Sequence, residues 1–242
     1  RAEALHDSQI VVRPFTPPPP SRRIGLVSRR LSARGSEYAA LAAHMSADYR
    51  GTVLPEQVCI TSGCNMAFSA AIMAMASVGD NVIVPVPYFF NHTMWLGMLG
   101  IEARHISALA PGISHPRPED AAKLIDANTR AIVLCSPNNP TGAVYPPDVI
   151  QSFFDLARER GIALVMDETY KDFREDSAPA HPVFQAEDWE SSFIHLYSFS
   201  KAYAMTGWRV GYAVVPRVLA GHLAKVQEPL ISCVNAVAQH AA

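Results

Sequence analysis

The chain has 242 residues, of which 49% are hydrophobic and 17% are charged, a balance that excludes a disordered protein. Its length allows one or two domains whose core needs no disulfide or metal. The net charge of −2 excludes a general basic surface for nucleic acid, and the longest apolar run, Ala70 to Ala76, is too short to cross a membrane.

Residues 1–36 differ in composition from the rest of the chain. They hold seven Arg and two acids, whereas the remainder holds 13 basic and 20 acidic residues. The prolines at 17–20 favour an extended lead-in, and they oppose an organelle transit peptide because proline breaks its helix. Two interpretations remain open for residues 1 to about 34: foreign or out-of-frame sequence, or a divergent N-terminal arm. Because the first residue is Arg1 rather than Met, we also expect a fragment.

From residue 37 onward, helical and strand patterns alternate along the chain. Leu41, Met45 and Tyr49 recur at intervals of four, which is typical of a helix. The expected helices are 37–49, 65–77, 90–99, 118–127, 148–160 and one from 216 to the end. The expected strands are 58–60, 81–84, 101–106, 131–135, 162–166, 193–197 and 209–215.

The strands indicate the fold class. Residues 162–166 are all apolar, as expected of a strand covered on both faces, and Gly161 before them suits the end of the preceding helix. Strand–helix alternation with apolar strands predicts an α/β fold with a mainly parallel central sheet and helices on both faces.

The four cysteines show no metal-binding spacing. Each lies among apolar or small residues, so we expect buried free thiols and a reducing compartment, which favours a cytoplasmic protein. The residues are Cys59, Cys64, Cys135 and Cys233.

Open α/β sheets bind ligands at the carboxyl ends of their strands, so the residues after each strand carry most weight. Gly63 follows the first strand and precedes a helix, whose free N–H groups would suit a phosphate. Many such turns contain Gly, so this signal is weak alone. The sequence has neither GxGxxG nor GxxxxGK.

Three later loops hold polar residues. The turn SPNNPTG at 136–142 can aim an amide at a ligand, and Asp167 would end a buried strand, where a charge needs a cationic partner. Of the four lysines, only Lys201 lies in a loop after a strand; Lys123, Lys171 and Lys225 are expected at the surface. A pyridoxal phosphate site needs a lysine, an acid for the ring nitrogen and donors for the phosphate.

The ordered motifs SPNNPTG, DETY and SFSKAYAMTGWRVGY resemble those of class I/II aminotransferases, pyridoxal phosphate enzymes of fold type I. The resemblance covers about residues 37–242. It implies that Lys201 forms the Schiff base and moves a proton, and that Asp167 keeps the ring nitrogen protonated. Asn139 and Tyr170 would hydrogen-bond the ring oxygen. The phosphate would be held by Ser198, Arg209 and the turn Gly63, Cys64 and Asn65, with Ser200 a weaker candidate.

The resemblance further implies that Phe89 stacks on the ring, with Phe90 as the rival, and that no metal takes part. It also implies a homodimer acting on an amino acid and a 2-oxo acid.

Three departures qualify the resemblance. The family usually carries a Tyr shortly before the position of Gly35, and none stands here. The Arg/Pro-rich segment replaces the stretch that covers the site, and the small C-terminal domain is largely missing. An aminotransferase is therefore the leading interpretation, with a carbon–sulfur lyase or a truncated, non-catalytic cofactor-binding remnant as alternatives.

Overall fold

The computed structural model describes residues 35–109, 112 and 114–241. The expectations for residues 1–34 lie outside this part of the chain. Helix α1 (Gly35–Tyr49) begins two residues before its expected start, so residues 35 and 36 belong to the first helix.

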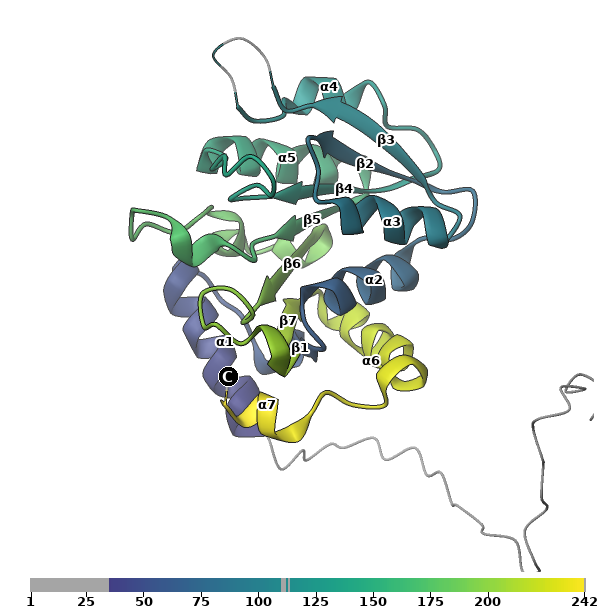
Figure 1. The fold of residues 1–242 in the computed structure, drawn as a ribbon. Helices are drawn as coiled ribbons and strands as arrows, with labels where there is room; N and C mark the ends of the chain where they lie inside the picture. The colour runs from purple at the N-terminus through teal and green to yellow at the C-terminus, as the bar shows by residue number, and fades with distance from the viewer. Residues whose placement is uncertain (1–34, 110–111, 113, 242) are drawn as a thin grey trace, which may run out of the picture. The chain divides into compact units, whose positions relative to one another are not determined.

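The described residues form a seven-stranded sheet in the order β1-β7-β6-β5-β4-β2-β3 (Figure 1). Every neighbouring pair is parallel except those that involve β7, which runs antiparallel to β1 and to β6. The expected mainly parallel sheet is thus confirmed. The strands are β1 (Val58–Thr61), β2 (Asn81–Val86), β3 (Glu102–Ser107), β4 (Thr129–Cys135), β5 (Ala163–Asp167), β6 (Phe193–Ser198) and β7 (Gly211–Val214).

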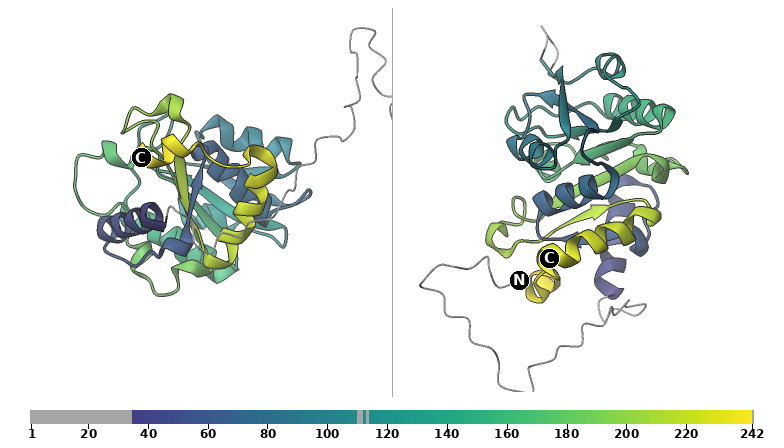
Figure 2. Two further views of the ribbon diagram at one scale, coloured as in Figure 1. Left: turned by 90° about the horizontal axis from the view of Figure 1, so that it is seen from below. Right: turned by 90° about the vertical axis from the view of Figure 1, so that its right-hand side faces the viewer.

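Helices cover both faces of this sheet, as Figure 2 shows for α1 and α6. One core contains buried residues of α1, α4 and α5, and the other contains residues of α2, α3 and α6. The remaining helices are α2 (Cys64–Met75), α3 (Phe90–Met98), α4 (Pro118–Ala122), α5 (Pro147–Arg160), α6 (Arg217–Ile231) and α7 (Ala236–Ala241).

Strand β4 shows why the buried strands are apolar throughout. Ile132 and Leu134 enter the core beneath α5, while Ala131 and Val133 enter the core beneath α2. Successive side chains of a strand point to opposite faces, so a strand between two helical layers has no position that faces water.

The structure corrects several expected boundaries. Helix α4 stops at Ala122 instead of 127. Asp126, which was expected in this helix, lies beyond it and accepts hydrogen bonds from Asn128 N and Thr129 Oγ1. The C-terminal helix is broken in two, with Pro229 near the end of α6 and Ser232 at a φ of 58°. Both features interrupt the helical hydrogen-bond pattern.

Two side-chain expectations were also wrong. Cys233 is exposed and Cys64 is only half-buried, whereas Cys59 and Cys135 are buried as expected. The Lys171 side chain is only 8% exposed and pairs with Asp48 and Asp172 instead of facing solvent. None of the described helices is long and apolar enough to cross a membrane.

Gly161 ends α5 in the left-handed conformation, with a φ of 64°. We expect Gly161→Ala to lower the free energy of unfolding by about 1 kcal/mol, because a Cβ disfavours this conformation. Gly97→Ala is the matched control: it lies inside α3 with open space around its Cα, so it should raise the free energy by about 0.5 kcal/mol. Urea unfolding measures the free energy of both variants. If both substitutions changed it in the same direction, the left-handed conformation assigned to Gly161 would be contradicted.

Candidate active site

The carboxyl ends of several strands meet at one edge of the sheet. Cys135 at the end of β4 pairs in register with Asp167 at the end of β5. Gly211, the first residue of β7, lies between Thr61 of β1 and Ser198 of β6. Polar residues that follow separate strands are thereby brought to one place.

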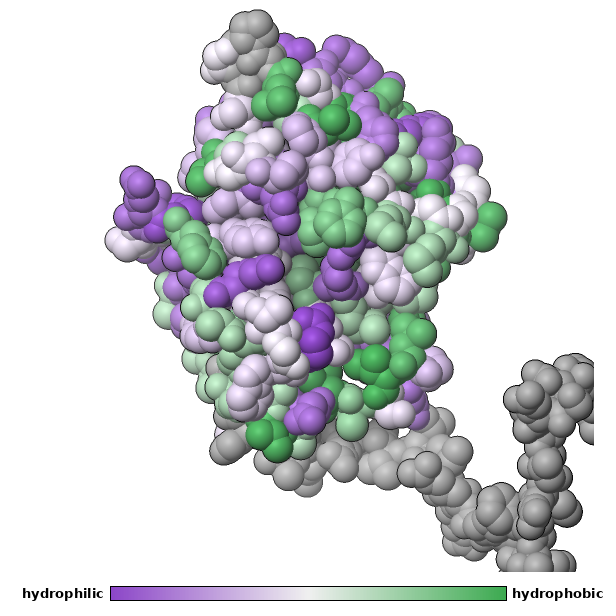
Figure 3. All heavy atoms as spheres, in the orientation of Figure 1, coloured by the Kyte–Doolittle hydropathy of each residue, from purple (hydrophilic) through white to green (hydrophobic). Residues whose placement is uncertain are grey.

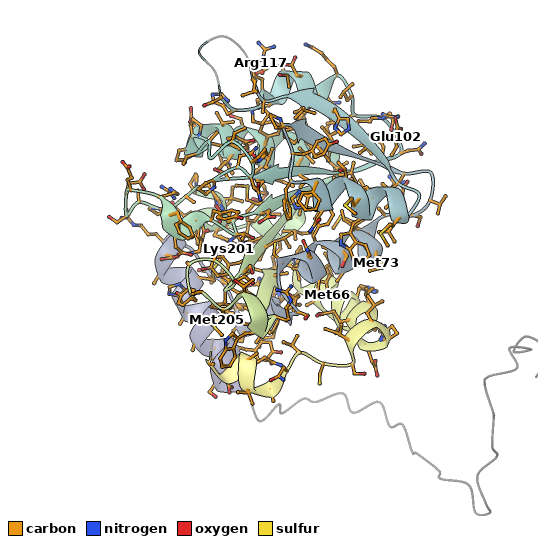
Figure 4. The ribbon with its side chains drawn as sticks, in the orientation of Figure 1. Met66, Met73, Glu102, Arg117, Lys201 and Met205 are labelled. Carbon is orange, nitrogen blue, oxygen red and sulfur yellow. The ribbon has the colours of Figure 1, made fainter. Side chains whose placement is uncertain are left out.

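A cavity of about 380 Å³ lies at this edge. Figure 3 shows a hollow on this face where polar and apolar side chains meet, and Figure 4 shows Lys201 on the loop after β6. All of the predicted site residues except Gly63 line the cavity: Cys64, Asn65, Phe89, Asn139, Asp167, Tyr170, Ser198, Ser200, Lys201 and Arg209. Phe90, the rival of Phe89, lines it too, together with Cys135, Thr169 and Thr206.

One end of the cavity is built to receive an anion. Gly63 precedes the first turn of α2 with a φ of 79°, so the free N–H groups of the helix start there. The Arg209 guanidinium lies beside this turn and donates hydrogen bonds to Ser62 O at 3.2 Å and to Thr206 O at 3.1 Å. Arg209 itself is left-handed, with a φ of 53°, and precedes β7 instead of belonging to it as expected.

A buried carboxylate lies at another side of the cavity. Asp167 is 3% exposed, its Oδ2 lies 3.0 Å from His92 Nε2, and its Oδ1 accepts a hydrogen bond from Thr169 N at 3.1 Å. Burial by itself raises the pKa of Asp167, but its contacts with His92 and Thr169 outweigh burial and hold the pKa below its usual value. The site therefore keeps a negative charge at Asp167.

His92 is the partner that the sequence analysis missed. It lies on α3 and is 2% exposed, with its ring 4.4 Å from that of Phe68, centroid to centroid. Nothing in the local sequence marks it, because its contact with Asp167 joins residues 75 positions apart. The only signal was the expectation that a buried Asp167 needs a partner.

Lys201, Tyr170 and Asn139 converge on the remaining side. Lys201 Nζ lies 6.0 Å from the centroid of the Tyr170 ring, and Asn139 Nδ2 lies 3.5 Å from Tyr170 Oη. Burial raises the pKa of the Tyr170 hydroxyl, so this group stays protonated and can donate. The cavity thus combines an amine, a carboxylate, a phenol and an amide.

A family model described as "Aminotransferase class I and II" matches residues 37–242. This chain belongs to the class I and II aminotransferase family. The family is pyridoxal phosphate-dependent. The chain is 31% identical to the aspartate aminotransferase of Thermotoga maritima over 194 residues, which are 80% of this chain and 51% of that protein. It is 32% identical to the aspartate/prephenate aminotransferase of Thermus thermophilus over 196 residues, with 78% and 49% covered.

Solved aminotransferase structures agree with this assignment. The Thermus thermophilus aspartate aminotransferase with maleate matches with a TM-score of 0.79 at 32% identity, over 85% of this chain and 53% of that one. The Thermotoga maritima enzyme matches with a TM-score of 0.80 at 29% identity, over 86% and 55%. The chain spans about half the length of the relatives it matches.

The described residues fit the cofactor of the family. Ser200 Oγ is buried in the cavity wall and has no hydrogen-bond partner in the described part of the chain. A Cβ on Gly63 would come within 2.5 Å of Arg209 Nη2, so the guanidinium would have to move, and the φ of 79° at this position itself favours glycine. A phosphate would suit this end of the cavity, because the Ser200 hydroxyl is an unused donor and the Arg209 cation lies beside the start of α2.

The Asp167–His92 pair makes stability depend on pH. We expect His92→Phe to lower the free energy of unfolding by about 3 kcal/mol at pH 7, because it removes the partner of a buried charge. The folded pKa of Asp167 lies below its unfolded value of about 3.9, so the contribution of the pair is present above that value and is lost as pH falls. The difference between variant and parent should therefore stay constant above about pH 4 and narrow as the pH falls below it.

Urea unfolding at several pH values measures this difference. His105→Phe is the control, since His105 stacks on Tyr88 and contacts no carboxylate among the described residues. A penalty for His92→Phe that stays constant with pH would contradict the assigned pair.

Proposed function

We propose that this chain is the cofactor-binding part of an aminotransferase that transfers an amino group from an amino acid to a 2-oxo acid. One observation carries the proposal: Asp167 ends β5, Lys201 follows β6 and Arg209 precedes β7, yet all three line one cavity. Pyridoxal phosphate chemistry requires an amine, a buried carboxylate and an anion-binding end in one cavity.

When bound, pyridoxal phosphate supplies an electron sink for the substrate's Cα. Lys201 Nζ would hold the cofactor covalently and would then take up and return a proton at Cα. Asp167, held ionised by His92, would keep the ring nitrogen protonated. Lys201 would thus act as the base, and Asp167 would act as a fixed negative charge.

The other cavity residues would position the ring. Asn139 and Tyr170 would donate hydrogen bonds to the ring oxygen, and Phe89 would stack on the ring face. The phosphate would be bound by Ser198, Ser200, Arg209 and the turn of Gly63, Cys64 and Asn65, whose backbone N–H groups begin α2. None of these roles needs a metal ion.

The partners follow from the family. Relatives over the matched half are aspartate and aspartate/prephenate aminotransferases, which supports an amino acid and a 2-oxo acid as the substrate class. We also propose a homodimer. The free cysteines among the described residues support a reducing compartment, and hence a cytoplasmic location.

The purified chain should bind added pyridoxal phosphate and show the absorbance band of a lysine-bound cofactor. Lys201→Ala should abolish both the band and amino transfer to a labelled 2-oxo acid, because no other lysine lines the cavity. Lys225→Ala on α6 is the control and should leave both unchanged. Absence of a band in the unmutated chain would refute the proposal.

The same assay separates the alternatives. A carbon–sulfur lyase would release ammonia and a 2-oxo acid without an acceptor, whereas an aminotransferase needs the acceptor for repeated turnover. A non-catalytic remnant would show the band but neither reaction. Either result would replace the proposed activity while leaving the cofactor site in place.

Arg209 offers a separate test of the phosphate end. We expect Arg209→Gln to weaken binding of pyridoxal phosphate by about 10- to 100-fold, the range for losing a charge-assisted hydrogen bond. Binding of pyridoxal, which lacks the phosphate, should change little. Arg217→Gln, which removes a surface ion pair with Glu190, serves as the control. Equal losses for both ligands would contradict the assigned role.

A further inference from the structure

Two consecutive residues at the end of β5 are buried acids, and each has its own histidine. Asp167 Oδ2 lies 3.0 Å from His92 Nε2, and Glu168 Oε2 lies 2.8 Å from His195 Nε2. Asp167 faces the layer of α3, whereas Glu168 contacts Tyr49 of α1 on the opposite face. Only Asp167 lines the cavity, so Glu168 is a second carboxylate placed behind the first.

Neutral or titratable groups surround Glu168. The Tyr49 hydroxyl donates a hydrogen bond to Glu168 Oε2, and His181 Nε2 lies 3.6 Å from the same oxygen. Glu168 is 0% exposed, and its Oε1 has no hydrogen-bond partner in the part of the chain that the structure describes. Among those residues no Lys or Arg pairs with Glu168; the nearby Lys171 pairs with Asp48 and Asp172.

Glu168 nevertheless keeps its charge. Burial raises the pKa of this carboxyl, but its contacts with His181 and His195 reverse the effect and hold the pKa well below the usual value. Burial lowers the pKa of His195, although its contact with Glu168 acts in the opposite direction. Lys171, a permanent cation, attracts Glu168 but makes its direct ion pairs with Asp48 and Asp172. A buried anion without a cation in direct contact is costly, which stability alone does not explain.

No described group of three or more His, Cys, Asp or Glu residues suits a metal ion, so metal binding does not account for the cluster either.

The charge of Glu168 reaches the cavity. The Cys135 thiol lines the cavity and lies beside Asp167 in the sheet register. Burial raises the pKa of this thiol, and Asp167 and Glu168 both raise it further. A group at the cavity wall therefore interacts with both carboxylates, one on each face of β5.

We propose that Glu168 is a positioning residue whose fixed negative charge, behind Asp167, strengthens the site's preference for a protonated ring nitrogen. The inference rests on the proposed function, because that nitrogen belongs to the cofactor. Asp167 makes the direct contact, and Glu168 adds a second attraction through the low-dielectric sheet. Tyr49, His181 and His195 hold the carboxylate in place from α1, the loop before residue 183 and β6.

The test is a pH titration of the ring nitrogen, followed by NMR of 15N-labelled pyridoxal phosphate bound to the protein. Glu168→Gln keeps the shape and an acceptor oxygen but removes the charge. We expect it to lower the midpoint of nitrogen protonation by about one pH unit, the size of a charge–charge effect across roughly 8–10 Å of protein. Glu168→Asp keeps the charge and should leave the midpoint close to that of the parent.

A purely structural role predicts the reverse order, since Asp is too short to reach Tyr49 and His195 whereas Gln is not. Equal midpoints for Glu168→Gln and the parent, or an Asp variant that shifts as far as the Gln variant, would overturn the inference. Asp155→Asn, a half-exposed acid on α5, is the control for loss of a remote charge and should not move the midpoint.

Folding of each variant is checked by thermal unfolding. If Glu168→Gln does not fold, the double variant Glu168→Met with Tyr49→Phe supplies an apolar, uncharged version of the cluster and carries the same expectation. Failure of the proposed function is distinguishable: the unmutated chain would then show no bound nitrogen signal at all. A bound signal without any difference between variants would overturn the role of Glu168 alone.

Discussion

The burial of an ionised Asp167 is the constraint on which the rest of the site depends. A carboxylate that is 3% exposed is tolerated only where donors replace its water, and His92 and Thr169 provide them. His92 comes from α3, so this helix must lie against the end of β5. The position of Phe89, one turn earlier, follows from the same packing. A wall of the cavity thereby depends on the contact between the Asp167 carboxylate and the His92 imidazole.

Parallel strands explain how distant motifs reach this carboxylate. Because β4, β5 and β6 run in one direction, their carboxyl ends share an edge, and the loops that follow them carry Asn139, Tyr170 and Lys201. Strand β7 runs antiparallel to β1 and β6, so it contributes its first residue to this edge instead of its last. Its first residue, Gly211, lies close to the Gly63 backbone, which places the preceding Arg209 beside the start of α2. One reversed strand therefore brings a cation to the anion-binding turn.

Much of this arrangement was predictable from local sequence signals. Apolar runs such as 162–166 predicted the strands, because both faces of the sheet are covered, and polar residues after strands predicted the site. The cofactor roles came from the resemblance and stay predictions. His92 and the buried state of Lys171 were not predictable, because they depend on contacts between distant segments. The break between α6 and α7 was not predicted, although Pro229 is a local signal for it.

The register of β5 decides which acid serves the cavity. Asp167 pairs with Cys135 on one side and with Leu196 on the other, and Glu168 N donates a hydrogen bond to Leu196 O at 2.9 Å. A slip of one residue would turn Glu168 toward α3 and Asp167 toward Tyr49, because side chains alternate between faces. The longer Glu side chain would then occupy space that Asp167 leaves open. Each acid would then meet the other acid's histidine with a side chain of the wrong length. The contacts of 3.0 Å to His92 and 2.8 Å to His195 therefore belong to the observed register alone.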